Sequence, residues 1–211
     1  MVYTAEEIAR DVRVALDLND VPTQLVLDAD IETLTTEEVI RSKIGDAAVR
    51  VLSEAPPTLL DGGHGFADSV FWGADGCGWT LLPSDFLRLI VFEMSDWEKP
   101  VTSPISEFDA AYTLQRSRHK GLRGTPQLPV CAVVMRPEGK ALEFYACADD
   151  TAYARRALYQ PYPKEDEYEG WDIPERCYRA VVYMTAALTA QALGDADKAA
   201  ALTQQSSAAM I

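Results

Sequence analysis

The stretch LLDGGHGFADSVFWGADGCGWTLLPSDF, residues 59–86, decides the fold, because the character of the sequence changes within it. Before this stretch, apolar residues recur at the spacing of amphipathic helices. After Asp68, β-branched and aromatic residues come in short runs between glycine and proline, which is typical of strands. Six of the twelve glycines lie here, and Gly62, Gly63 and Gly65 allow the chain to turn. We therefore expect a helical region to end and a β region to begin in this stretch.

Two amphipathic helices are expected upstream. A threonine is followed three residues later by a glutamate at 4–7 and again at 35–38, which is the spacing of a capping box at a helix N-terminus. The first helix is expected over residues 5–18. The second ends before Pro56 and Pro57, since proline disfavours helical backbone in the residue before it.

Two hairpins are expected in the β region. The runs SVFWG and GWTLLP flank residues 74–77, whose Asp-Gly pair suits the positive φ angles of a tight turn. The runs VCAVVMR and KALEFYACA are joined by residues 137–139, Pro-Glu-Gly, which is a second turn signal. Hairpins join antiparallel strands, so the pattern predicts an antiparallel β unit.

Three further elements are expected in the same region. In FLRLIVFEMSDW, residues 86–97, alternation places Leu87, Leu89 and Val91 on one face of a strand and the residues between them on the other. The run RALYQPYP, residues 156–163, is a candidate closing strand whose prolines indicate a sheet edge. A short helix is expected near SEFDAAYTLQ, residues 106–115.

Helix signals return near the C-terminus. Asp172 is followed three residues later by Glu175, which indicates an N-terminal cap, and Pro174 fits the first turn of a helix. Gly194 is expected to end this helix, and a shorter alanine-rich helix is expected to start at Asp195. Because the small residues of 195–211 bury little area, we expect this segment to order only against a partner.

The expected fold class is α+β. Neither the N-terminal nor the C-terminal helices can cover their apolar stripes alone, so we expect them to pack together. Residues 1–67 and 168–211 would then form a small helical bundle, and residues 68–167 an antiparallel β unit inserted between its two halves.

Composition excludes several kinds of protein. No apolar run approaches the roughly 18 residues of a membrane span, so no membrane association is expected and a cytoplasmic location is favoured. The four cysteines form no C-x-x-C pair and the chain has two histidines, so neither a metal site nor a cofactor is expected. The formal net charge of −14 repels a nucleic-acid backbone at long range.

No catalytic motif is recognised. The run GGHGFADS lacks the lysine and the spacing of a phosphate-binding loop. His64 has Asp61, Asp68 and Ser69 nearby in the sequence, but a catalytic triad is defined by geometry, and no nucleophile elbow is present. We therefore expect His64 to be a loop histidine, and no residue is assigned a catalytic role.

Two charged clusters are candidate interaction sites. The run QRSRHKGLRG carries Arg116, Arg118, Lys120 and Arg123, and the run KEDEYEGWD carries Glu165, Asp166, Glu167 and Glu169. The basic run is either a flexible, solvated loop or an arm that docks on an acidic surface, and both interpretations stay open. If it is an arm, the acidic run of an adjacent subunit, or another acidic face, is its expected partner.

Several motifs resemble the head-to-tail adaptor, or connector ring, proteins of tailed bacteriophages. The first is a W-x-L-L-P stretch at Trp79, Leu81, Leu82 and Pro83. The second is a helix that begins Ile173-Pro174-Glu175, continues through Ala180 and ends at Gly194-Asp195. The order of helix, helix, β region and helix pair also matches. The similarity is greatest to structural proteins from phages and prophages of gut Bacteroidales, including crAss-like phages.

This resemblance implies a non-enzymatic virion component. Its subunits would assemble into a ring that joins the portal protein to the tail or to further ring proteins. The chain would be found in the cytoplasm of the bacterial host during assembly and afterwards in the virion. DNA would pass through the central channel without specific binding, which suits an acidic chain.

Two other functions stay open as alternatives. A small cytosolic enzyme would need a concave pocket that gathers His64 or His119 with carboxylates. A β-type binding module would hold a peptide or sugar with aromatic side chains, for which the candidates are Trp72, Trp79, Tyr145, Tyr159 and Tyr162.

Overall fold

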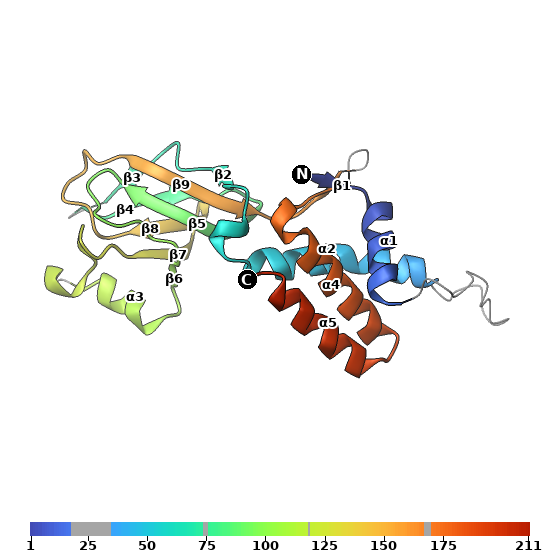
Figure 1. Cartoon of the computed structure of the whole chain (residues 1–211). Helices are drawn as coiled ribbons and strands as arrows, with labels where there is room; N and C mark the ends of the chain where they lie inside the picture. The colour runs from blue at the N-terminus through green and yellow to red at the C-terminus, as the bar shows by residue number, and fades with distance from the viewer. Residues whose placement is uncertain (18–34, 74–75, 118, 167–169) are drawn as a thin grey trace. The chain divides into compact units, whose positions relative to one another are not determined.

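The computed structural model describes residues 1–17, 35–73, 76–117, 119–166 and 170–211. It has the expected α+β class and divides into two compact units, residues 1–61 with 162–211 and residues 62–161 (Figure 1). The division lies a few residues before the expected boundaries at 67/68 and 167/168. Each unit is described by itself below.

The first unit contains the long helices. Both capping boxes form, because Thr4 and Thr35 each accept from the backbone of the glutamate three residues on, whose carboxylate accepts from the threonine N–H. The first helix ends before its expected limit at residue 18, since Asp17 has a φ of 55°. The helical elements are α1 (Ala5–Ala15), α2 (Thr36–Glu54), a 3-10 turn η1 (Pro57–Leu59), α4 (Glu175–Ala192) and α5 (Ala196–Ala208).

Helix α4 contacts each of the other three long helices of this unit. Its apolar stripe is buried from Cys177 to Leu188. The hydroxyl of Tyr178 donates to Asp11 of α1 at 2.7 Å, and its ring stacks on Tyr3 at 4.1 Å between centroids. These contacts join the N-terminal and C-terminal segments in one core.

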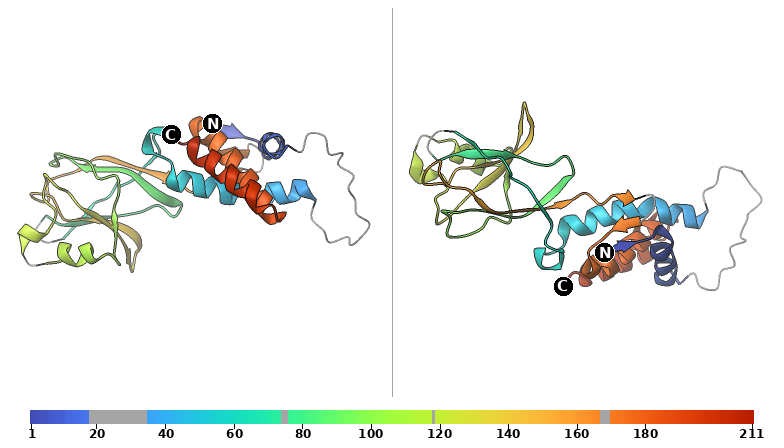
Figure 2. Two further views of the ribbon diagram at one scale, coloured as in Figure 1. Left: turned by 60° about the horizontal axis from the view of Figure 1, so that its bottom comes forward. Right: turned by 90° about the horizontal axis from the view of Figure 1, so that it is seen from above.

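The C-terminal helix packs on α4 within the single chain, whereas we expected this segment to order only against a partner. Figure 2 shows α5 running alongside α4. Leu202 and Met210 are buried, and the buried hydroxyl of Ser206 donates to the Ala180 carbonyl of α4 at 2.8 Å. Alanine and serine bury little area, but they let the two helices approach closely enough for this bond.

A small sheet flanks the helices, in the order β1 (Val2–Tyr3), β11 (Gly170–Asp172), β10 (Glu165–Asp166). The expected cap at Asp172 is wrong, because this residue lies in β11 and its carboxylate accepts from the Met1 amino group at 3.1 Å. Pro174 occupies the N-cap position of α4 without a side-chain hydrogen bond.

The second unit consists of two facing sheets and a short helix (Figure 1). The smaller sheet has the order β2 (His64–Gly65), β9 (Ala154–Pro161), β5 (Phe86–Met94). The larger has the order β3 (Phe71–Trp72), β4 (Gly78–Leu81), β8 (Gly139–Phe144), β7 (Cys131–Arg136), β6 (Ile105–Ser106). The short helices are α3 (Ala110–Gln115) and the 3-10 turn η2 (Lys120–Leu122). Phe92 and Met94 of one sheet and Leu142 and Phe144 of the other are buried in one core between them.

Both expected hairpins are present, but three details of the β unit differ from the prediction. The unit is not wholly antiparallel, because β6 pairs with β7 in parallel. Strand β9 lies between β2 and β5 rather than at an edge, and Pro161 is tolerated because it is the last residue of the strand. Bulges in the pairing of β5 with β9 break the simple alternation, and residues 89–94 are all buried.

The outer face of the larger sheet positions the candidate site. Along β7 and β8, residues alternate between the core and this outer face, as strands require. Ala132, Val134, Ala141 and Tyr145 form a second buried cluster there, against which Tyr112 of α3 packs. Helix α3 therefore lies on the face of the sheet that points away from the main core.

Candidate functional site

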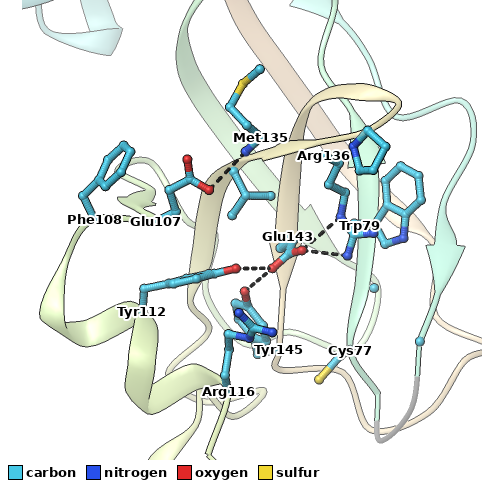
Figure 3. A pocket seen from close by; sticks show the side chains of 14 residues that line it. Cys77, Trp79, Glu107, Phe108, Tyr112, Arg116, Met135, Arg136, Glu143 and Tyr145 are labelled. Atoms are coloured by element: carbon cyan, nitrogen blue, oxygen red, sulfur yellow. Dashed lines mark hydrogen bonds and ion pairs between the residues drawn. The ribbon is translucent and has the colours of Figure 1, made fainter.

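A pocket of about 720 Å³ opens between α3 and strand β4 on this outer face (Figure 3). Its floor is formed by side chains of β7 and β8. The residues used below are Trp79, Phe108, Tyr112, Arg116, Met135, Arg136, Glu143 and Tyr145. A pocket of this size is within the range of sites that hold a small ligand or a peptide side chain.

Glu143 lies at the centre of the pocket floor and is only 13% exposed. One carboxylate oxygen, Oε1, accepts from Nε and Nη2 of Arg136 at 3.0 and 2.7 Å. The other, Oε2, accepts from the hydroxyls of Tyr112 at 3.1 Å and Tyr145 at 2.5 Å. Four donors from three segments of the chain thus converge on one carboxylate.

The pKa of Glu143 follows from this setting. Burial is the largest influence and by itself raises the pKa, but the hydrogen bonds from Tyr145, Arg136 and Tyr112 together lower it below its ordinary value. The carboxylate therefore stays ionised near neutral pH. A general acid or base works best with a pKa near the operating pH, so this geometry makes Glu143 a tie between α3 and the sheet rather than a proton-transfer group.

Arg136 is fixed from two sides. Its guanidinium lies 4.4 Å from the ring centre of Trp79, and the Trp79 ring in turn stacks on Phe71 at 4.3 Å. Since Nε and Nη2 are bonded to Glu143, the group is held by an ion pair as well as by the stack. Neighbours therefore occupy both faces of Trp79.

Hydrogen bonds hold the described part of the basic run, residues 115–117 and 119–124, to the rest of the protein. These bonds count against the interpretation of this part as a flexible loop. The amide N–H of Gly124 donates to the buried side chain of Gln115 at 2.7 Å, which closes the loop at its base. Arg123 donates from Nε to the Ser117 carbonyl at 2.5 Å, and its Nη1 lies 3.7 Å from the sulfur of Cys77. Arg123 therefore stabilises the loop itself.

Arg116 is the exposed cation of this run that lines the pocket. It follows α3 directly, and its guanidinium lies 5.9 Å from the ring centre of Tyr112. Within the described residues it makes no ion pair. Arg118 lies outside the described residues, and Lys120 is described only by its backbone in η2.

The acidic candidates belong to the other unit. Glu165 and Asp166 are exposed on β10, the edge strand of the small sheet. Glu167 and Glu169 lie outside the described residues.

His64 lies on the short strand β2 rather than in the loop that we expected. It is exposed on β2, where the edge of its ring faces Tyr159. Asp61 belongs to the other unit, and in the described part of the chain no hydrogen bond joins His64 to Asp68 or Ser69. Gly63, just before His64, is required for a structural reason: its φ is 71°, and a side chain there would collide with the Tyr159 backbone.

Three of the four cysteines, Cys131, Cys147 and Cys177, are buried, and Cys77 is partly buried. All four are free, and no group of three or more potential ligands that could hold a metal ion is found in this part of the chain. Burial raises the pKa of Cys147 to about 12 and that of Cys177 to about 11. Thiols with such values are protonated and unreactive at neutral pH.

The five aromatic candidates divide between core and surface. Trp79 and Tyr145 line the pocket. Tyr159 is buried between the two sheets and Trp72 packs against the same core, whereas Tyr162 is 47% exposed.

Sequence reasoning missed Glu143 and Tyr112, which join α3 to the sheet. One signal was available: Glu143 is the single carboxylate in the predicted strand KALEFYACA, which is otherwise apolar after Lys140. Its partner Arg136 stands on the other strand of the same predicted hairpin. The contribution of Tyr112 could not be anticipated, because it is 31 residues away in the sequence.

Comparison with known proteins gives no match to a protein family and no curated protein of significantly similar sequence. In the described part of the chain, no helix combines the length and the apolar composition that crossing a membrane requires. The functional proposals therefore rest on the residues and their geometry.

Proposed function

We propose that this chain is a non-enzymatic structural protein of a tailed phage or prophage virion, a head-tail adaptor. Copies of it would form a ring that joins the portal to the tail around the DNA channel. The observation that carries the proposal is the organisation of the chain: a unit of long helices built from both ends of the sequence, with a separate β unit inserted between α2 and α4. This is the order of elements on which the resemblance to connector proteins rests.

Two further observations support a role in assembly. The chain has 33 acidic and 19 basic residues, and this excess of negative charge disfavours tight contact with the DNA backbone, as suits a protein that lets DNA pass. The carboxylate with the most hydrogen-bond donors in the pocket holds α3 in place and stays ionised, so it acts as a structural tie.

The interaction residues proposed from the sequence keep this role in part. Arg116 remains available to a neighbouring subunit or the portal, whereas Arg123 is engaged within its own loop. Glu165 and Asp166 remain exposed on an edge strand.

The second candidate function is a β-type ligand-binding module. The pocket between α3 and β4 favours it, because two of the expected aromatic residues, Trp79 and Tyr145, line that pocket. Both faces of Trp79 are covered, so a sugar ring could not stack on it as on an open platform.

Reconstitution with the portal tests the adaptor proposal. The purified chain is mixed with the portal oligomer from the same genome and imaged by electron microscopy, with the portal of an unrelated phage as control. We expect a ring of this chain on the tail-facing end of its own portal and none on the control. A chain that stays free in both mixtures contradicts the proposal.

A further inference from the structure

The pocket beside α3 presents a free cation at its edge. Arg136 is neutralised by Glu143, but Arg116 is exposed and forms no ion pair within the described residues. An exposed guanidinium that makes no ion pair within the described residues is suited to a carboxylate that arrives from another molecule, because it can donate two parallel hydrogen bonds to it.

The edge of the same pocket carries two exposed apolar side chains beside the carboxylate of Glu107, which accepts from the Met135 N–H. Phe108, just before α3, is 90% exposed, and Met135 of β7 is 66% exposed. Both line the pocket, where Figure 3 shows them on the same side of Glu143. Phenylalanine and methionine are enriched at the buried centre of protein interfaces, so this edge is suited to an aromatic or aliphatic side chain of a partner.

A segment of the chain itself has the complementary chemistry. Tyr162 is 47% exposed, and three residues later Glu165 is exposed on the edge strand β10. Within the described residues Glu165 makes no ion pair. Residues 162–164 lie between strands β9 and β10, and the three residues of chain from Tyr162 to Glu165 span at most about 10 Å.

We infer that the pocket receives residues 162–166 of a second copy of this chain. The ring of Tyr162 packs against Phe108 and Met135, and the carboxylate of Glu165 pairs with Arg116. The pocket and the segment are different surfaces, so a contact repeated from each copy to the next is head-to-tail and can close into a ring. The inference rests on the proposed ring function for its biological setting, because it requires copies to lie side by side.

A charge swap between the two sides tests the contact in the full-length chain. Sedimentation velocity is measured over a concentration series for the wild type, Arg116→Glu, Glu165→Arg and the double variant. We expect each single reversal to weaken self-association about tenfold or more and the double variant to recover most of it. Arg50→Glu is the matched control, since Arg50 is exposed on α2 and belongs neither to the pocket lining nor to residues 162–166, and it should leave self-association unchanged.

A crosslink identifies the segment that enters the pocket. A benzophenone amino acid replaces Phe108, and equal amounts of isotopically light and heavy chain are mixed and irradiated. We expect crosslinked peptides that join position 108 of one copy to residues 162–166 of the other. Crosslinks to a different segment, a double variant no better than the single ones, or a chain that remains monomeric to about 1 mM with and without the portal would each overturn the inference.

The outcome is separable from that of the adaptor proposal. If the crosslink and the charge rescue are found while the portal is not bound, the docking contact stands and the adaptor function fails. If the portal is bound and position 108 crosslinks to the portal instead, the adaptor function stands and the docking contact fails.

Discussion

Replacing Glu143 with glutamine should destabilise the β unit by about 2 kcal/mol. The change keeps the shape of the side chain but removes the charge that Arg136 pairs with. Removing one partner of a buried ion pair costs about 3–5 kcal/mol. We expect less here, because the Arg136 side chain is 32% exposed and water can replace part of the lost interaction. The tyrosine hydroxyls can turn to accept from the new amide, so their bonds add little to the loss.

Tryptophan fluorescence in urea measures this effect. Three of the four tryptophans, Trp72, Trp79 and Trp97, lie in the β unit, so the signal reports mainly on its unfolding. With an m-value of about 1–2 kcal/mol per molar for a unit of this size, a loss of 2 kcal/mol lowers the midpoint by roughly 1–2 M urea. Glu138→Gln is the control, since Glu138 is exposed in the turn of the same hairpin. Equal midpoints for Glu143→Gln and the wild type would refute the reasoning.

The difference in stability between the wild type and Glu143→Gln should depend on pH. The pKa of Glu143 is lower in the folded chain than its ordinary value of 4.5, so its contribution to stability is complete above that value. The contribution is lost as the pH falls through the folded pKa. The stability difference between wild type and Glu143→Gln should therefore be full at pH 7 and shrink below 4.5. A difference that grows on acidification would contradict this assignment.

Two predictions concern the helical unit. Leu202→Ala should lower the free energy of unfolding by about 2–4 kcal/mol in thermal or urea melts, because Leu202 is 4% exposed where α5 packs on α4. Limited proteolysis should leave residues 196–208 intact in the wild type. Rapid cleavage there would show that α5 is not docked in the free chain. Gly45→Ala should not give the gain of about 1 kcal/mol that alanine usually brings to a helix interior, because its Cβ would lie 2.9 Å from the Trp171 ring; a gain of that size would contradict this packing.

The starts of α1 and α2 were predictable because their causes are local. At Thr4 and Thr35 the capping hydrogen bonds span three residues, and the residues that make them are all visible in a short window of sequence. The turn of the second hairpin was predictable for the same reason, since Gly139 has a φ of 134°, which glycine adopts readily.

Two of the corrected predictions concern partners that are distant in the sequence. The carboxylate of Asp172 was expected to cap α4, yet it bonds to the Met1 amino group, 171 residues away. Strand β9 was predicted to lie at an edge because of its prolines. Strand β2 nevertheless pairs with it, but only at Leu158 and Tyr159, so Pro161 is not required to donate a hydrogen bond to β2. Neither partner can be inferred from the local pattern, because sheet order depends on which strands meet in three dimensions.

The stretch from residue 59 to residue 86 by itself determined that a helical region gives way to a β unit, because glycine content and hydrophobic period are properties of neighbouring residues. The alternation of β7 and β8 likewise determined which residues share a face. Only the tertiary structure decided that α3 lies on that face and brings Tyr112 to Glu143, which leaves Arg116 at the edge of a pocket. The physical reason is that a buried carboxylate must find its donors wherever the fold supplies them, and three of these four come from β7 and α3.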